Sequence, residues 1–187
     1  GALTPIRISG KPIYSDPLQA MLCKNFIGHG SNGVFRRAIV DQIGDFDETL
    51  KSCEDMDFWL RIAETRSWKF FRVSRALSYY RVRPSGLSFN IDKMQQTQTR
   101  VMQSAYERNP KFVGPLIPTI EAYMYRYLAR VCLASGDISQ ADSLIRLALN
   151  KKRNIFVRDF KSLTTLVMVK TFPISQFFVK SLLGSKK

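Results

Sequence analysis

Apolar residues in the first third of the chain recur at helical spacing and are bounded by helix start and stop signals. Asp16-Pro17 pairs a capping acid with a proline at the first helical position, ahead of Leu18, Met21 and Leu22. A two-turn helix is expected over residues 37–43, ended by Gly44. A further helix is predicted from Ser52 or Cys53 to about Thr65.

Other segments alternate in the manner of strands. Residues 68–73 and 76–82 are the two strand candidates, and Ile6-Arg7-Ile8 and Pro12-Ile13-Tyr14 are weaker ones. The sequence therefore predicts an α+β fold that is mostly helical, with short strands in its first part.

From Asp92 onward the pattern is wholly helical, and Pro110, Gly114, Pro115 and Pro118 interrupt it. We place a domain boundary there, between residues 1–109 and an all-α subdomain over 110–187. Within the latter, residues 122–150 resemble one tetratricopeptide repeat: two helices, a Gly136-Asp137 turn and small residues where the helices touch. A generic helical hairpin explains the same pattern.

Composition narrows the class of protein. The chain has 187 residues, of which 45% are hydrophobic and 12% aromatic, which is typical of a globular protein with a real core. The net charge is +14, made up of +4 over residues 1–90 and +10 over residues 91–187. From Lys151 onward there are nine basic residues and one acid, Asp159, and this basic tail favours an anionic membrane surface or an acidic partner. The chain lacks the pattern of a nucleic-acid-binding module, so nucleic acid is not an expected partner.

Cysteine usage and hydropathy bear on location. Cys23, Cys53 and Cys132 are odd in number and lack metal-ligand spacing, which favours reduced thiols in a cytoplasmic protein. No apolar run reaches the length of about 18 residues that a membrane span needs. We therefore expect a cytoplasmic protein, peripheral to the inner face of the membrane if its tail binds lipid.

The most informative stretch runs from Gly33-Val34-Phe35-Arg36-Arg37, through Gly44-Asp45-Phe46-Asp47, to Glu54-Asp55-Met56-Asp57. It resembles the acceptor-side half of an inverting family 2 glycosyltransferase of the GT-A fold, over roughly residues 20 to 90. The resemblance implies transfer of a sugar from a nucleoside diphosphate sugar to a hydroxyl acceptor. It also implies that the donor-binding half lies outside this chain, so that the fragment alone is inactive.

The resemblance assigns roles to the acidic pair. Asp55 falls on the catalytic base, with Glu54 beside it as a partner of the acceptor hydroxyl. A base at a helix start is rigid and ionised, which suits removal of a hydroxyl proton. The same residues also suit a plain capping box, with Ser52 as the N-cap and Asp55 three positions on.

Substrate-binding roles are predicted for Arg36, Arg37, Asp57, Trp59 and Arg83. Arginine binds oxyanions in a bidentate manner, although Arg36 and Arg37 also fit plain surface cations. Asp57 and Arg61 stand four residues apart and are expected to pair along the helix. Arg83 occupies the position of a family histidine that can meet the metal or the diphosphate, and arginine cannot ligate a metal.

The resemblance implies Mn²⁺ or Mg²⁺ for the full-length enzyme and no metal bound to this fragment. Asp45-Phe46-Asp47 and Asp55-Met56-Asp57 have Asp-x-Asp spacing, but neither follows a buried strand. An exposed strand edge would also allow the fragment to form a homodimer. The alternative function is a helical adaptor with a basic docking surface for a membrane or a protein.

Overall fold

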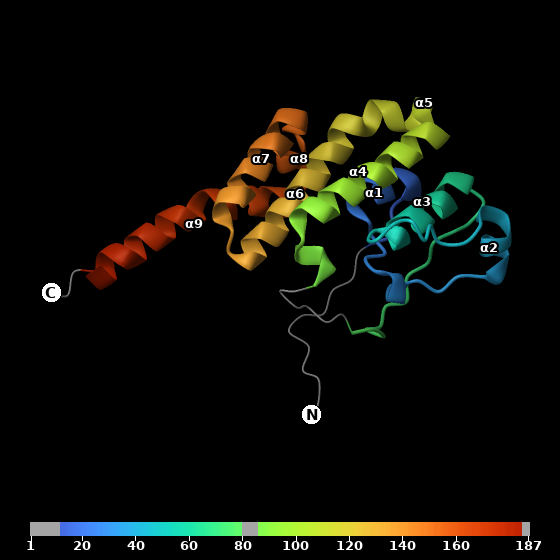
Figure 1. Ribbon diagram of the computed structural model, residues 1–187, viewed down its shortest axis with the longest axis horizontal. Helices are drawn as coiled ribbons and strands as arrows, with labels where there is room; N and C mark the ends of the chain where they lie inside the picture. Colours follow the sequence, from blue (N-terminus) through green and yellow to red (C-terminus); the bar gives the residue numbers. More distant parts are fainter. Residues whose placement is uncertain (1–11, 80–85, 185–187) are drawn as a thin grey trace. The chain divides into compact units, whose positions relative to one another are not determined.

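The computed structural model describes the backbone of residues 12–79 and 86–184, with side chains to residue 172 (Figure 1). The chain divides into two compact units, which we treat separately. The first holds Gly1–Arg83 with Thr97–Pro110, and the second holds Pro84–Gln96 with Lys111–Lys187. The long helix α4, Ile91–Arg108, contributes to both units.

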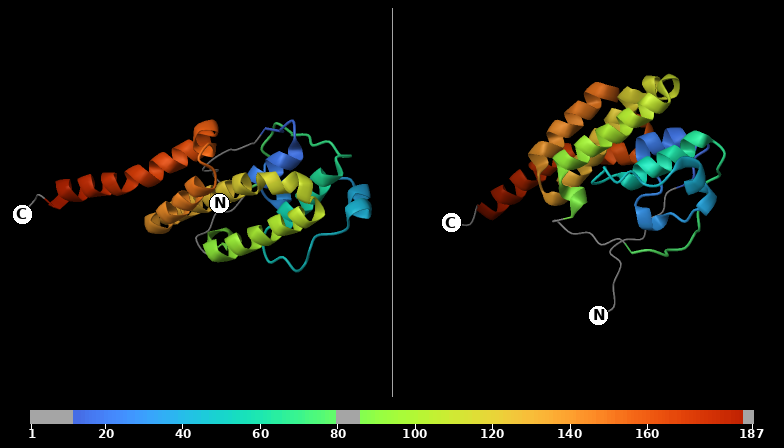
Figure 2. Two further views of the ribbon diagram at one scale, coloured as in Figure 1. Left: turned by 90° about the horizontal axis from the view of Figure 1, so that it is seen from above. Right: turned by 45° about the vertical axis from the view of Figure 1, so that its right-hand side comes forward.

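Three helices and a short turn build the first unit, together with the last turns of α4. They are α1 (Pro17–Lys24), the 3-10 turn η1 (Gly30–Asn32), α2 (Arg37–Ile43) and α3 (Glu54–Thr65). Helix α1 packs against α3, as the two views of Figure 2 also show, and their apolar faces meet in a core that includes Leu18, Met21, Phe58 and Leu60. Burial of these side chains is the main stabilising contribution in this unit.

Local signals in the sequence set the boundaries of these helices. The Asp16 side chain accepts a hydrogen bond from the Gln19 N–H at 3.1 Å and caps α1, as predicted. Gly44, at φ +79°, ends α2 where the sequence predicted it.

The second unit is a helical stack. It contains η2 (Leu87–Phe89), the rest of α5 (Pro110–Val113), η3 (Gly114–Leu116), α6 (Ile117–Ser135), α7 (Ile138–Lys152), α8 (Ile155–Arg158) and α9 (Phe160–Gly184). Helices α6 and α7 form the predicted hairpin around Gly136, at φ +84°. Small residues lie fully buried in this unit, as expected where helices approach closely: Ala122, Ala129, Ala141 and Ala148.

The predicted strands are wrong. Residues 68–73 and 76–79 are extended but form no ladder, Pro12 to Tyr14 forms none either, and no strand occurs anywhere among residues 12–79 and 86–184. The remaining strand positions, residues 6–8 and 80–82, lie outside the described residues. A strand needs a neighbour to accept its backbone hydrogen bonds, and the described residues provide none.

The predicted α+β class is therefore corrected to all-α for the described residues.

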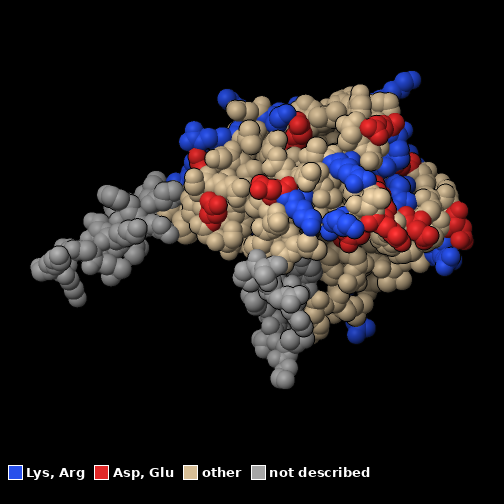
Figure 3. Space-filling model, viewed as in Figure 1, with Lys and Arg blue, Asp and Glu red and all other residues tan. Residues whose placement is uncertain are grey.

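The acidic and basic side chains on one face are shown in Figure 3, where acidic groups gather near α2 and α3 among basic ones. Within the described residues, no helix is both long enough and apolar enough to cross a membrane.

Candidate functional site

The acidic pair stands at the start of α3, but the cap differs from the prediction. Helix α3 begins at Glu54, and its N-cap is Cys53 in the left-handed conformation (φ 60°, ψ 15°) without a side-chain capping bond. Asp55 is thus the second helical residue, and Ser52 lies one position outside the helix. The predicted capping box between Ser52 and Asp55 is wrong, because the left-handed turn at Cys53 moves Ser52 out of register.

The Asp55 carboxylate is held by backbone donors. Its Oδ1 accepts a hydrogen bond from the Met56 N–H at 2.6 Å. The side chain is half-buried, and burial raises the pKa of Asp55, with the nearby charge of Glu54 adding to the increase. The N–H groups of Met56, Asp55 and Gly30 oppose this shift. The result is a desolvated carboxylate at the positive end of a helix.

A short loop packs over this carboxylate. The Cβ of Asp55 would lie 3.9 Å from a Cβ built on Gly30. Asn25 fastens the loop through two hydrogen bonds with the Gly28 backbone, at 3.1 and 3.0 Å, and the Asn32 amide donates to the Ile27 carbonyl at 2.8 Å. These bonds fix the backbone that desolvates Asp55.

Aromatic packing fixes the other side of the helix start. Phe46 stacks on Phe58 with ring centroids 4.3 Å apart, and Phe35 contacts both Phe58 and Trp59. Trp59 is buried, and a Cβ on Gly33 would approach its indole to 2.2 Å. Trp59, predicted to bind substrate, is therefore part of the core, and Gly33 is the residue that lets the chain pass it.

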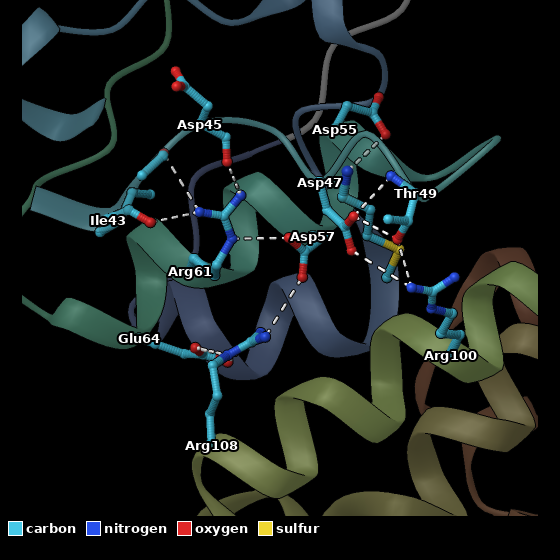
Figure 4. Close-up of polar contacts among 12 residues, drawn as sticks. Ile43, Asp45, Asp47, Thr49, Asp55, Asp57, Arg61, Glu64, Arg100 and Arg108 are labelled. Atoms are coloured by element: carbon cyan, nitrogen blue, oxygen red, sulfur yellow. Dashed lines mark hydrogen bonds and ion pairs between the residues drawn. The ribbon is translucent and has the colours of Figure 1, made fainter. Parts of the chain in front are cut away.

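Asp57 lies in a buried network of charges (Figure 4). Its carboxylate accepts a hydrogen bond from Arg61 Nε at 2.8 Å, which confirms the predicted pairing, and Arg108 lies 3.5 Å from its other oxygen. Arg61 also donates to the carbonyls of Ile43 and Asp45, at 2.7 and 2.6 Å. Arg61, held by Asp57, thus ties α3 to the end of α2, and both oxygens of Asp57 face arginines.

Asp47 is also engaged. It accepts hydrogen bonds from the hydroxyl and the N–H of Thr49 at 2.6 and 2.9 Å, and Arg100 lies 3.9 Å away. The hydroxyl bond is the main reason that the pKa of Asp47 falls below its usual value. The contacts of Arg100 and Arg108 could not be predicted from the sequence, because these arginines stand more than 40 positions from Thr49 and Glu64, the residues they bond.

Neither Asp-x-Asp pair suits a divalent cation. In each pair one carboxylate faces arginine, and Figure 4 shows the Asp45 side chain pointing away from Asp47. A cation site needs several converging oxygen ligands that are not already neutralised. Among the described residues, no group of three or more potential ligands gathers in one place. The metal implied by the resemblance therefore does not fit these side chains.

The predicted basic residues are not brought to the carboxylates. Arg36 and Arg37 are exposed at the start of α2, and Arg37 lies 3.6 Å from Asp41 along the helix. Within the described residues no ion pair joins Asp55 to either arginine. Arg83 lies outside the described residues. Glu54 is exposed beside Asp55.

Of the three acids in the Glu54–Asp57 segment, Asp55 alone combines partial burial with a carboxylate that faces no arginine in the described chain. Such a group can accept a proton from a hydroxyl placed against it.

Comparison of the chain with protein-family models, curated proteins and solved structures found no match in any of the three.

Proposed function

We propose that this chain is the acceptor-side part of an inverting glycosyltransferase, in which Asp55 is the general base. The base removes the proton of an acceptor hydroxyl as that hydroxyl attacks the anomeric carbon of a nucleoside diphosphate sugar. Glu54, exposed next to it, binds the acceptor. This assignment rests on the motif that spans Phe35-Arg36-Arg37, Gly44 to Asp47 and Glu54-Asp55.

The observation that carries the proposal is the different treatment of two acids on the same helix. Asp57 is neutralised by Arg61 and Arg108, whereas the Asp55 carboxylate is bound by backbone N–H groups and points away from that network (Figure 4). Desolvation raises the pKa of Asp55 and so strengthens it as a base. A residue that only begins a helix gains nothing from such desolvation, since the helix dipole favours its charged form.

Exposed apolar residues near this site support a role as one part of a larger assembly. In the extended segment 68–79, Trp68 is anchored to Gln42 by a hydrogen bond of 2.7 Å and Phe70 packs on Phe26. The side chains that follow, from residue 71 to residue 79, are exposed, and the large apolar ones among them are Phe71, at 85%, Val73, Leu77 and Tyr79. An apolar surface of this kind is typical of a face that another polypeptide covers.

The proposal assigns the donor diphosphate to polypeptide outside this chain. The residues here do not fit the divalent cation that the family uses, so a cation and its ligands would have to be supplied with the donor half. Leaving-group stabilisation would then also come from there. A cytoplasmic location belongs to the same proposal, and the three free thiols Cys23, Cys53 and Cys132 fit a reducing compartment.

The test uses the natural protein that carries this sequence. Asp55→Asn keeps the shape of the side chain and removes the base, so kcat should fall by about 10²- to 10⁴-fold while the Kd for the donor stays unchanged. Asp45→Asn is the matched control, because the structure uses its backbone carbonyl and leaves its side chain pointing away. A rate for Asp55→Asn within a factor of about ten of the Asp45→Asn rate would contradict the assignment.

A second candidate function is that of a helical adaptor. The observation that favours it is the α6–α7 hairpin, whose tight packing of small residues is typical of helical repeats. In that case Asp55→Asn and Glu54→Gln would leave the biological activity intact, and the exposed side chains of the second unit would carry it. The homodimer predicted from an exposed strand edge loses that basis, because the described residues form no strand. Dimer formation itself remains a prediction, which sedimentation of the chain at increasing concentration would measure.

A further inference from the structure

Helix α9 buries small residues and exposes large apolar ones. Ser162, Thr165 and Val169 recur at helical spacing and are at most 1% exposed, on the face that packs against α6, α7 and α8. A helix in a water-soluble stack normally does the reverse, with its larger apolar side chains directed inward. The outward face of α9 therefore needs its own explanation.

That outward face carries a stripe of large apolar side chains, with the smaller Thr164 and Thr171 among them. Phe160, at 79% exposed, is followed at helical spacing by Leu163 and Val167, and Met168 and Phe172 lie alongside. Val157 of α8 is 86% exposed just before the stripe begins. Single exposed apolar residues are common on proteins, but five large ones gathered on one side of a helix over three turns mark an interaction surface.

Cations accompany the stripe in the sequence. Arg158, the last residue of α8, and Lys161, in the first turn of α9, are both exposed, and Lys152 and Arg153 at the end of α7 are exposed as well. Lys161 stands two turns before Met168 and therefore lies on the same side of the helix as Met168 and Phe172. Asp159, the single acid after residue 150 in the sequence, is occupied by hydrogen bonds from the Ser162 N–H and hydroxyl, at 2.8 and 2.7 Å.

We propose that α8 and the first half of α9 lie on an anionic membrane surface. The stripe of Phe160, Leu163, Val167, Met168 and Phe172 enters the boundary between headgroups and acyl chains, while Arg158 and Lys161 bind lipid phosphates. An amphipathic helix with cations beside its apolar face binds in this way without crossing the bilayer. The inference is independent of the proposed glycosyltransferase activity.

Charge selects this occupant over a second copy of the chain. Two copies joined through the stripe would bring the clusters around Arg158 and Lys161 together, and like charges at an interface oppose association. An anionic lipid surface attracts the same cations. The stripe alone would suit an apolar protein groove as well, but the cations that accompany it match phosphate groups.

The experiment measures flotation of the whole chain with vesicles of phosphatidylcholine, and with vesicles of phosphatidylcholine mixed with phosphatidylglycerol, at increasing NaCl. We expect binding to the anionic vesicles only, weakened by salt because surface charges are screened. Phe160→Ser with Val167→Ser should weaken binding by about tenfold or more, since both apolar side chains leave the lipid. Lys161→Ala should weaken it by about fivefold.

Matched controls sit elsewhere in the same unit. Leu147→Ser changes an exposed apolar residue of α7, and Lys111→Ala changes an exposed cation of α5. Both should bind within about twofold of the parent chain. Circular dichroism of each variant checks that the helices persist, which is expected because all the altered side chains are exposed.

Three results would overturn the inference. One is binding that is absent, or equal on neutral and anionic vesicles. Another is a Phe160→Ser/Val167→Ser variant that binds as well as Leu147→Ser, which would assign any binding to another part of the chain. The third is a concentration-dependent dimer of the parent chain that the double substitution abolishes, because a second copy would then be the occupant of the stripe.

Discussion

The network around Asp57 makes a sharp prediction about stability. The side chain of Asp57 is 7% exposed and that of its partner Arg61 is 16% exposed. Asp57→Ala therefore removes a buried carboxylate and leaves Arg61 and Arg108 without this ion-pair partner. Removal of one partner from a buried ion pair costs about 3–5 kcal/mol. We expect the lower limit, about 3 kcal/mol, because Arg61 keeps the carbonyls of Ile43 and Asp45 and Arg108 keeps Glu64.

The matched control is Asp41→Ala. Asp41 and Arg37 are also an Asp–Arg pair four residues apart on a helix, but their side chains are 65% and 86% exposed. An exposed pair of this kind contributes about 0–1 kcal/mol, so the unfolding free energy should change by less than about 1 kcal/mol. The two variants therefore differ in burial and share the chemistry.

Urea unfolding followed by tryptophan fluorescence measures the effect. Both tryptophans of the chain, Trp59 and Trp68, lie in the first unit, so the signal reports the unit that contains Asp57. The midpoint for Asp57→Ala should fall well below that of the parent chain, with Asp41→Ala close to the parent. A loss for Asp57→Ala of less than about 1 kcal/mol would refute the buried network and leave Asp57 available for substrate.

Three further predictions concern the same unit. Asp55→Asn should be as stable as the parent chain or more stable at pH 7: its pKa is raised in the folded state, so the ionised carboxylate costs stability above the unfolded pKa of about 3.9, and the difference should shrink as pH falls toward that value. Destabilisation by Asp55→Asn in thermal melts at pH 7 would mean that Asp55 acts as a helix-starting acid. Gly33→Ala should cost about 1–3 kcal/mol and alter the fluorescence of Trp59, because its Cβ would meet the indole at 2.2 Å; an unchanged melting temperature would contradict this packing. Calorimetry of the chain with nucleoside diphosphate sugars and Mn²⁺ should show no binding tighter than about 1 mM, and micromolar binding would locate the donor site within this sequence.

The start of α1, the ends of α2 and α6, and one near-neighbour ion pair were determined by the sequence alone. Helix α1 begins after Asp16 with Pro17 at its first position, as predicted, and α2 and α6 end at Gly44 and Gly136. Arg61 pairs with Asp57, one turn away on the same helix. These features depend on bonds between residues at most about four positions apart, and such bonds form wherever the helix forms. The Glu54-Asp55 pair, too, was identified from the motif before its surroundings were known.

Only the tertiary structure decided what the polar groups of the site do. Asp57 became a structural residue because Arg108 reaches it from α4, and Trp59 became a core residue because Gly33 passes against its ring. The cap at Cys53 replaced the one expected at Ser52. Each outcome depends on which distant segments meet, and residue spacing carries no information about that.

Tertiary contacts also decided the outcome for the predicted strands and for helix α9. Residues 68–79 have the alternation of a strand, yet backbone pairing needs a neighbour that the described chain does not offer, so they remain extended and partly exposed. The sequence predicted that the residues of α9 are helical, but it did not predict which face of the helix is buried. That choice followed from contact with α6 and α7, because Ser162, Thr165 and Val169 fit close against neighbouring helices, and it left the larger apolar side chains outside.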